Sequence, residues 1–195
     1  MEGFLGNQVN MQQINSEYNG KARLWKESIP KLIYPTIDTI EQVLCTDLPK
    51  ISGEKQVALE VMIPVGGRFL YGFLGAVFKP SASGQFLLQI PVSTDSEKIF
   101  ADSIAADLDQ IRFGLPNEYV QSVIDSAMFH LHKYQGIKIL GSGTLCFEPA
   151  AHGELSSSKR FFGDIVAVLV QLLVLNRVDT DNNSDAPLGK LIITA

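Results

Sequence analysis

The sequence predicts an α+β fold in which helices pack on one face of a mixed or antiparallel four-stranded sheet. Two runs of alternating apolar residues, with an apolar and aromatic run between them, follow one another within residues 56–92. Alternation with a period of two is typical of half-buried strands, and short connections between them favour an antiparallel meander. Two later helical patterns enclose a fourth alternating run. A sheet covered by helices on one face fits this order best.

The composition indicates a chain that can build one core. The chain has 195 residues, of which 46% are hydrophobic and 19% are charged, enough for one domain. The net charge of −5 argues against a general polyanion binder, because such proteins depend on Lys and Arg. A local basic patch stays open. Cys45 and Cys146, without a signal-peptide pattern at the N-terminus, predict reduced thiols and a cytoplasmic protein.

The first part of the chain is expected to lie outside the main domain. We divide the chain into an N-terminal arm and helix over residues 1–55 and an α+β domain over residues 56–195. Residues 1–20 are rich in Asn, Gln and Gly and are expected to form a flexible arm. Residues 35–48 carry apolar side chains at helical spacing, with Pro35 near the start and Pro49 past the end. This pattern predicts a helix.

The three consecutive strands are expected at residues 56–65, 69–78 and 85–92. Gly66 and Gly67 separate the first two strands, and residues 81–84 form a turn before the third. The side chains at positions 58, 60 and 62 fall on the face opposite the apolar one. We therefore expect this alternate face to be only partly buried.

Helical patterns follow the strands. Residues 94–97 have the spacing of a capping box, and apolar residues at positions 100, 104, 108 and 111 predict a helix. A second helix begins after Pro116, which needs no intrahelical hydrogen bond there, and Glu118 lies at the positive end of the helix dipole. It is expected to end near Gly136, where glycine favours termination.

The C-terminal third completes the predicted fold. Residues 137–147 alternate and predict the fourth strand, and residues 158–176 predict a last helix capped by serine. That helix is apolar nearly all round, so it should be buried on most sides or lie in a subunit interface. The run of residues 165–175 is too short for a membrane span of about 20 residues. Residues 191–193 favour a short closing strand.

Two loops are candidates for contact with a partner. In the first, Arg68 could contact a phosphate and Tyr71 could stack on a base; alternatively, Gly66 and Gly67 form only a tight turn with Tyr71 packed at the sheet edge, which we favour. For the second loop we give equal weight to two interpretations. In one, its cations and the helix N-terminus contact a partner; in the other, serine caps the helix and the first turn is solvated. Its candidate residues are His152, Ser157, Lys159 and Arg160.

The sequence predicts no catalytic residue, no cofactor and no metal site. A triad of Ser157, His152 and Asp164 can be drawn, but no G-x-S-x-G elbow accompanies it. His130 and His132 are two residues apart on a predicted helix, so they point to different faces and do not form a zinc pair. We therefore expect a protein that is not an enzyme.

Three separated stretches resemble domain IV of translation elongation factor G. They are GGRFLYGFLGAVFKP (residues 66–80), GLPNEYVQSVIDSAM (114–128) and HGELSSSKRFFGDIVAVLV (152–170). The resemblance covers about residues 56–193 and implies that domain's sheet with a left-handed βαβ crossover. The chain departs from elongation factor G because it lacks a GTPase phosphate loop. The family's tip histidine aligns with Gly153, one residue after His152, and its acidic turn residue aligns with Ser156.

Two functions follow as expectations. The resemblance implies a stand-alone binding module that contacts the ribosome or RNA through the two candidate loops. The acidic net charge favours instead a protein–protein assembly module, which forms a homo-oligomer or docks on another subunit through its hydrophobic last helix or an open sheet face. No membrane partner is expected.

Overall fold

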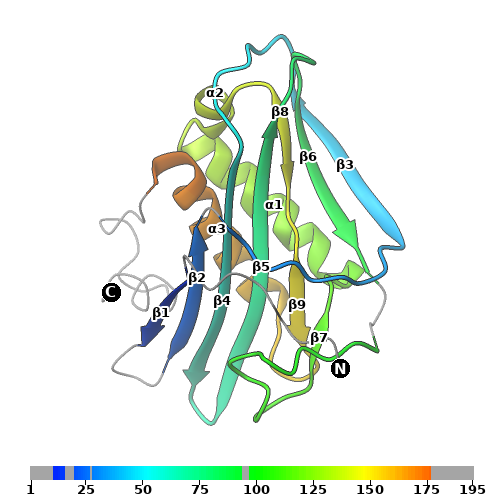
Figure 1. The fold of residues 1–195 in the computed structure, drawn as a ribbon, viewed down its shortest axis with the longest axis vertical. Helices are drawn as coiled ribbons and strands as arrows, with labels where there is room; N and C mark the ends of the chain where they lie inside the picture. The colour runs from blue at the N-terminus through cyan, green and yellow to red at the C-terminus, as the bar shows by residue number, and fades with distance from the viewer. Residues whose placement is uncertain (1–10, 16–19, 27, 94–96, 177–195) are drawn as a thin grey trace.

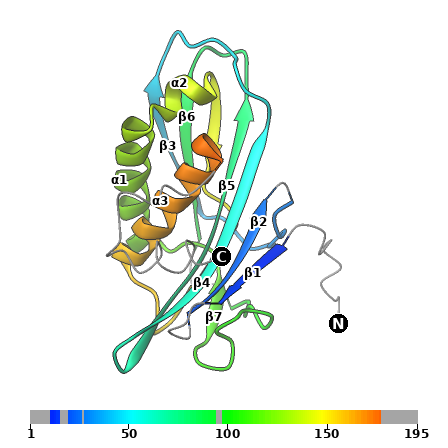
Figure 2. The ribbon, with the colours of Figure 1, turned by 90° about the vertical axis from the view of Figure 1, so that its left-hand side faces the viewer.

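The computed structural model describes residues 11–15, 20–26, 28–93 and 97–176. These residues form one strongly curved sheet, a half-barrel, with helices lying in its hollow (Figures 1 and 2). Seven strands lie side by side in the order β1-β2-β4-β5-β8-β6-β3, and two further strands, β9 and β7, continue the sheet beside β5.

Neighbouring strands are antiparallel except for β6 and β8, which are parallel. The nine strands are β1 (Met11–Asn15), β2 (Lys21–Lys26), β3 (Asp38–Cys45), β4 (Lys55–Val65), β5 (Arg68–Pro80), β6 (Phe86–Val92), β7 (Ile111–Phe113), β8 (Gly143–Cys146) and β9 (Ala150–Gly153). The long β4–β5 hairpin is the central pair, and its register is regular from Lys55↔Phe78 to Val65↔Arg68.

Strands β8 and β9 pair with successive parts of β5, β8 with residues 77–80 and β9 with residues 73–74. The chain leaves the sheet between these two strands, where the amide of Gly75 donates to the carbonyl of Pro149 at 2.7 Å. A Cβ on Gly75 would lie 2.4 Å from the carbonyl oxygen of Glu148. Only glycine therefore permits this close approach of the two backbones.

The concave face of the sheet holds the main core. Helices α1 (Asn117–Lys133) and α3 (Lys159–Leu175) lie there together, and the short helix α2 (Gly136–Leu140) follows α1 (Figure 2). Ten residues of α3 are buried, including Phe161, Phe162 and Leu169. The sequence predicted that this apolar helix is either buried on most sides or part of a subunit interface, and the structure shows the first. Helix α3 therefore presents no open apolar face to a partner.

The convex face of β4 and β5 carries a second, smaller core. Residues 97–110, which we call the convex lobe, cross this face as a series of turns. Phe100 of the lobe packs edge-on against Phe73 of β5, with ring centroids 5.9 Å apart, and Phe73 meets Trp25 of β2 at 5.6 Å. Both faces of β4 are therefore buried, and the alternate face expected to be partly exposed is covered by the lobe.

The predicted fold class is wrong: the sheet has nine strands and a half-barrel shape, instead of four strands with helices packed on one face. The antiparallel meander is also wrong, because β8 lies between β5 and β6. Residues 11–15 and 21–26, from the segment expected as an arm and helix, are strands of the same sheet. The short strand expected at residues 191–193 lies outside the described residues.

Three local predictions are corrected as well. Residues 35–48 contain strand β3 and no helix, because their many β-branched side chains pair with β6. Residues 100–111 are turns ending in β7. Residues 137–147 begin as helix α2 and become a strand only after Gly141, whose φ is +77°. The strands predicted at 56–65, 69–78 and 85–92 and the helices beginning after Pro116 and Ser158 are confirmed.

Candidate functional site

The two candidate loops stand beside each other at one end of the sheet, which we call the loop end. It consists of the β4–β5 turn, residues 64–68, and the loop between β9 and α3, residues 154–158. The amide of Tyr71 donates to the carbonyl of Ser156 at 3.0 Å, and the hydroxyl of Ser157 donates to the carbonyl of Tyr71 at 2.8 Å. The structure therefore joins two segments that lie about 90 positions apart in the sequence.

The sequence-predicted residues of the first loop divide into exposed and buried ones. Gly66, Gly67 and Arg68 are exposed at the hairpin tip, and Gly66 has a φ of +61°, which suits glycine in a turn. Tyr71 is fully buried, and its hydroxyl donates to Glu60 at 3.0 Å. Its ring is therefore not available to stack on a base.

The residues of the second loop also serve different purposes. His152 is buried, and its Nδ1 lies 3.0 Å from the carbonyl oxygen of Gly114. Ser158 caps α3 by accepting from the amide of Phe161 at 3.3 Å. Lys159 and Arg160 are exposed in the first turn of α3. Only these two cations of the second loop's candidates remain at the surface.

Asp109 of the convex lobe fixes the second loop. Its Oδ2 accepts from the amides of Leu155 at 3.1 Å and Ser156 at 3.0 Å, and it also accepts from the Ser156 hydroxyl. Ser157 adds a further restraint, because its hydroxyl oxygen accepts from the amide of Gly153 at 2.9 Å. The loop is held from several sides, yet the side chain of Leu155 is 91% exposed.

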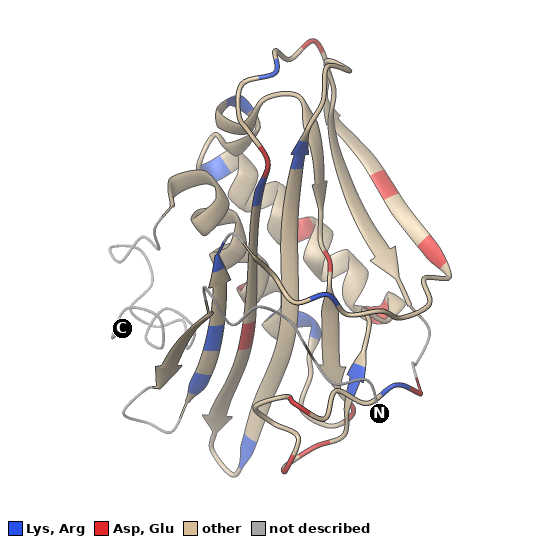
Figure 3. Cartoon of the chain, viewed as in Figure 1, with Lys and Arg blue, Asp and Glu red and all other residues tan. Residues whose placement is uncertain are grey.

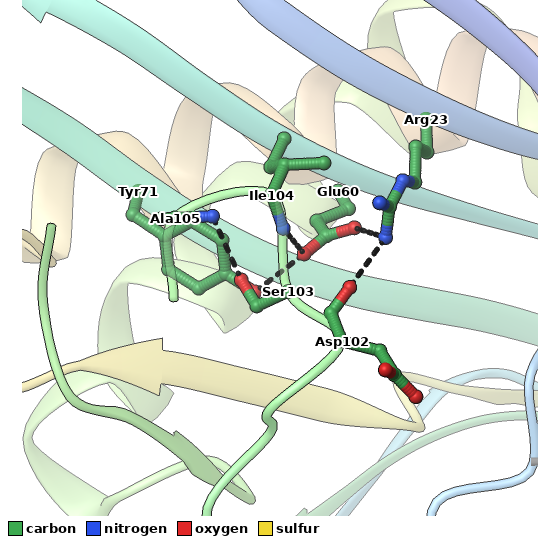
Figure 4. Close-up of polar contacts among 7 residues, drawn as sticks. All are labelled: Arg23, Glu60, Tyr71, Asp102, Ser103, Ile104 and Ala105. Atoms are coloured by element: carbon green, nitrogen blue, oxygen red, sulfur yellow. Dashed lines mark hydrogen bonds and ion pairs between the residues drawn. The ribbon is translucent and has the colours of Figure 1, made fainter. Parts of the chain in front are cut away.

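A buried polar cluster fastens the convex lobe to the sheet (Figure 4). Glu60, on β4, is fully buried, and its carboxylate accepts from the amide of Ile104 and from the Tyr71 hydroxyl, both at 3.0 Å. Arg23, on β2, lies 3.2 Å from the other carboxylate oxygen and donates to the carbonyl of Asp102 at 2.7 Å. The sheet therefore provides a carboxylate and a guanidinium for the backbone of the lobe.

The environment of Glu60 has opposing effects on its proton. Burial raises the pKa of Glu60, because a carboxylate loses its hydration there, and the charge of Arg23 opposes that shift. Burial also raises the pKa of Tyr71, and the neighbouring Glu60 charge adds to the effect. The Glu60 side chain is fully buried and the Arg23 side chain is 28% exposed, and the hydrogen bonds of both hold the lobe on the sheet.

A shallow polar groove runs between α1 and α3. It has a volume of about 610 Å³ and is lined on one side by Ser122, Ser126 and His130 and on the other by Gly163 and Asp164. The helices approach closely at Gly163, where a Cβ would lie 3.0 Å from the Ser122 hydroxyl oxygen. Both serine hydroxyls donate to backbone carbonyls of α3 at 2.6 Å. They are engaged in helix packing, and the Ser126 hydroxyl oxygen also lies 3.4 Å from Nδ1 of His130.

Two titratable groups of the groove have shifted pKa values. Burial lowers the pKa of His130, and burial raises the pKa of Asp164, which the Arg160 charge opposes. The Nδ1 of His130 lies 2.8 Å from the carbonyl oxygen of Ser126. The Ser122 and Ser126 hydroxyls beside these groups donate to backbone carbonyls, so they are not placed as nucleophiles.

The structure does not assemble the triad drawn from the sequence. The Ser157 hydroxyl donates to a backbone carbonyl, and Asp164 lines the groove between the helices. Within the described ranges, no three His, Cys, Asp or Glu side chains gather as metal ligands would. In the same part of the chain, no helix has both the length and the apolar character needed to cross a membrane.

Sequence reasoning missed three residues of this end. Asp109 falls within residues 100–111, where the sequence predicts a helix, Glu60 lies on the strand face expected to be only partly buried, and Leu155 is not among the candidate residues. One signal was available for Glu60, since a lone acidic residue within eleven mostly apolar strand residues requires a buried partner. For Asp109 no such local signal exists.

Comparison of the chain with protein-family models, with curated proteins and with solved structures finds no match. The likeness to elongation factor G domain IV is therefore a resemblance of three short motifs.

Proposed function

We propose that this protein is a non-catalytic binding module that contacts a protein partner through the loop end. The observation that carries this proposal is the presentation of Leu155. Its side chain is 91% exposed, while the amide groups around it are bound by Asp109 and its neighbours. A large apolar side chain on a fixed loop is suited to insert into a pocket of a partner.

The fixed geometry favours binding on physical grounds. A loop that is already ordered loses little conformational entropy when a partner binds, so more of the contact energy appears as affinity. Val65, at the tip of the neighbouring hairpin, is 49% exposed and adds a second apolar contact. Arg68 lies opposite Val65 in the β4–β5 register and supplies a guanidinium, a group enriched at protein interfaces.

Site-specific photo-crosslinking tests this proposal. A benzophenone amino acid is placed at position 155 and, in a matched protein, at Ile51, which is exposed in the connection between β3 and β4. Both proteins are irradiated in an extract of the source cells. We expect a discrete protein adduct from position 155 and none from position 51. Unlabelled protein should compete for that adduct, and the Leu155→Asp variant should not.

Two results contradict the proposal. One is the absence of any adduct from position 155, and the other is the same adduct pattern from both positions. Circular dichroism of each labelled protein and of Leu155→Asp controls for folding. Because Leu155 is almost fully exposed, its replacement should change the stability by less than about 0.5 kcal/mol.

A second candidate is contact with the ribosome or its RNA. It is favoured by the resemblance and by the exposed cations Arg68, Lys159 and Arg160. Binding to purified ribosomes should then weaken steeply with salt, and Arg68→Ala and Lys159→Ala should each reduce the slope by about one. Binding without salt dependence, or no binding, excludes this candidate and leaves the protein partner.

A cytoplasmic setting is part of the same proposal. Cys45 and Cys146 are both free thiols, and burial raises the pKa of Cys146 to about 12, which keeps it protonated and unreactive. Free thiols are usual in the reducing cytoplasm. Cell fractionation with an antibody against the chain would test the setting.

A further inference from the structure

We infer a second interaction surface at the outer edge of β3, which fits an extended segment of another protein that carries basic residues. The proposal concerns a different part of the molecule from the loop end and does not depend on it. The segment would add to the sheet as one more strand, a recurrent mode of peptide recognition.

The edge of β3 is open for such pairing. Strand β3 is the last strand in the sheet order and pairs only with β6 among the described residues. Figure 1 shows it at the margin of the sheet, with no helix or strand drawn beyond it. It is eight residues long, and a strand of that length presents a row of backbone groups to an incoming chain, although the Thr39 amide already donates to the Asp38 carboxylate at 2.7 Å.

The core layer stops abruptly at this edge. On the concave face, Ile40 and Leu44 of β3 pack against the core but are only half-buried. Ile90 of β6, which stands opposite Ile40, is fully buried. An added strand with apolar residues on that face would bury the remaining surface of Ile40 and Leu44 as β3 itself does for β6.

Charge decides the kind of partner. The charged residues of β3 are Asp38 and Glu41, and the strand has no Lys or Arg (Figure 3). Glu41 lies on the exposed face opposite Gln89, whose amide nitrogen it accepts from at 2.6 Å. A lysine or arginine directly across from Glu41 would add a favourable cross-strand pair. The fitting segment therefore alternates apolar residues with basic ones.

A second copy of the chain is a poor occupant of this edge through β3. Pairing of two β3 strands would bring carboxylates from both copies and no cation, and the register centred on Glu41 would oppose the two Glu41 side chains. Like charges directly opposite one another destabilise a sheet. The same acidic edge that invites a basic segment therefore discourages self-association.

Binding of designed peptides tests the inference. The probe is a fluorescent eight-residue peptide that alternates lysine with valine. The controls are the same peptide with glutamate in place of lysine and a version with methylated amides at alternate residues. Fluorescence anisotropy with the intact protein should show at least tenfold tighter binding of the lysine peptide than of either control, because one control reverses the charge and the other removes backbone donors.

Protein variants locate the contact. Glu41→Lys should weaken binding of the lysine peptide about fivefold, whereas Glu54→Lys, which makes the same charge change at an exposed residue outside β3, should change it less than twofold. Leu155→Asp should leave peptide binding unchanged, which separates this surface from the loop end. Circular dichroism verifies that each variant is folded.

The inference is overturned by any of four results. The first is equal binding of the lysine and glutamate peptides, and the second is undiminished binding of the methylated peptide, which would exclude strand addition. The third is an equal effect of the two glutamate variants. A dimer in solution that Glu41→Lys dissociates would also overturn it, since the edge would then belong to a second copy.

Discussion

The two faces of the β4–β5 hairpin are covered in different ways. The concave face meets the long helix α3, whose backbone hydrogen bonds are satisfied within the helix, and the contact there is apolar. The convex face meets the irregular lobe of residues 97–110, and the contact there includes Glu60, Arg23 and Tyr71 as well as aromatic rings.

The difference follows from backbone chemistry. A helix needs only an apolar stripe to pack on a sheet, because its amides and carbonyls have partners already. A lobe made of turns brings unpaired amides to the interface, and each must find an acceptor. Glu60 accepts from the amide of Ile104 for this reason, so the convex side depends on charge and hydrogen bonding where the concave side depends on packed volume.

The largest expected effect tests the concave side. Phe162 on α3 is fully buried, and its ring centroid lies 4.8 Å from that of Tyr119. Phe162→Ala should lower the free energy of unfolding by about 4 kcal/mol, since it leaves a cavity in the main core. Urea denaturation measures the loss. Phe129→Ala, on the exposed face of α1, is the control and should cost less than about 0.5 kcal/mol.

A somewhat smaller effect tests the convex side. Glu60→Ala should cost about 3 kcal/mol, because it leaves the Tyr71 hydroxyl and the Ile104 amide without their acceptor. The lobe should open before the rest of the sheet, so amide exchange at Ile104 should accelerate more than exchange at Leu169 in α3. Equal acceleration at both amides would show that the two faces unfold as one unit.

The link between the lobe and the loop end predicts the next effect. Asp109→Ala should cost about 2 kcal/mol by removing the acceptor of two amides and a hydroxyl. Amide exchange at Leu155 and Ser156 should rise, and crosslinking from position 155 should weaken. Asp107→Ala, an exposed change two residues away, is the matched control. Similar behaviour of both variants would argue against a fixed loop.

The smallest effect concerns pH and separates the two faces again. Burial raises the pKa of Glu60, so the folded lobe holds this proton more tightly than the unfolded chain does. Its contribution to stability is then complete below the ordinary pKa of 4.5 and decreases as the pH rises through the raised value. The stability of the native protein relative to Glu60→Gln should fall over that window. A difference that grows with pH would reverse the assigned direction.

Much of the central fold could be predicted from the sequence, and the exceptions have physical causes. The period of two in β4 and β6, the apolar run of β5, Pro116 and Glu118 at the start of α1 and the serine cap of α3 are local signals, and they predicted those elements. Residues 35–48 have spacing that fits a helix, but pairing with β6 decides in favour of a strand. Residues 97–110 have helical spacing too, yet the amide of Ile104 donates to Glu60 from another strand.

The candidate site was predictable only in part, for the same reason. The two loops could be chosen from their glycine, serine and basic residues, and both reach the surface at the loop end. The favoured interpretation had Tyr71 packed at the sheet edge, but its full burial depends on the convex lobe about 30 positions later and could not be foreseen. The exposure of Leu155 depends likewise on Asp109, which lies 46 positions earlier.

The position of β8 between β5 and β6 has a consequence for how the chain reaches this structure. Strands β5 and β6 are consecutive in sequence, yet neither can join the other until residues 143–146 have been threaded between them. A nascent chain that ends before residue 143 therefore holds two separate half-sheets, β1-β2-β4-β5 and β6-β3. Joining strands that are far apart in the sequence is slow. Shielding the two half-sheets until they join would protect the growing polypeptide from aggregation.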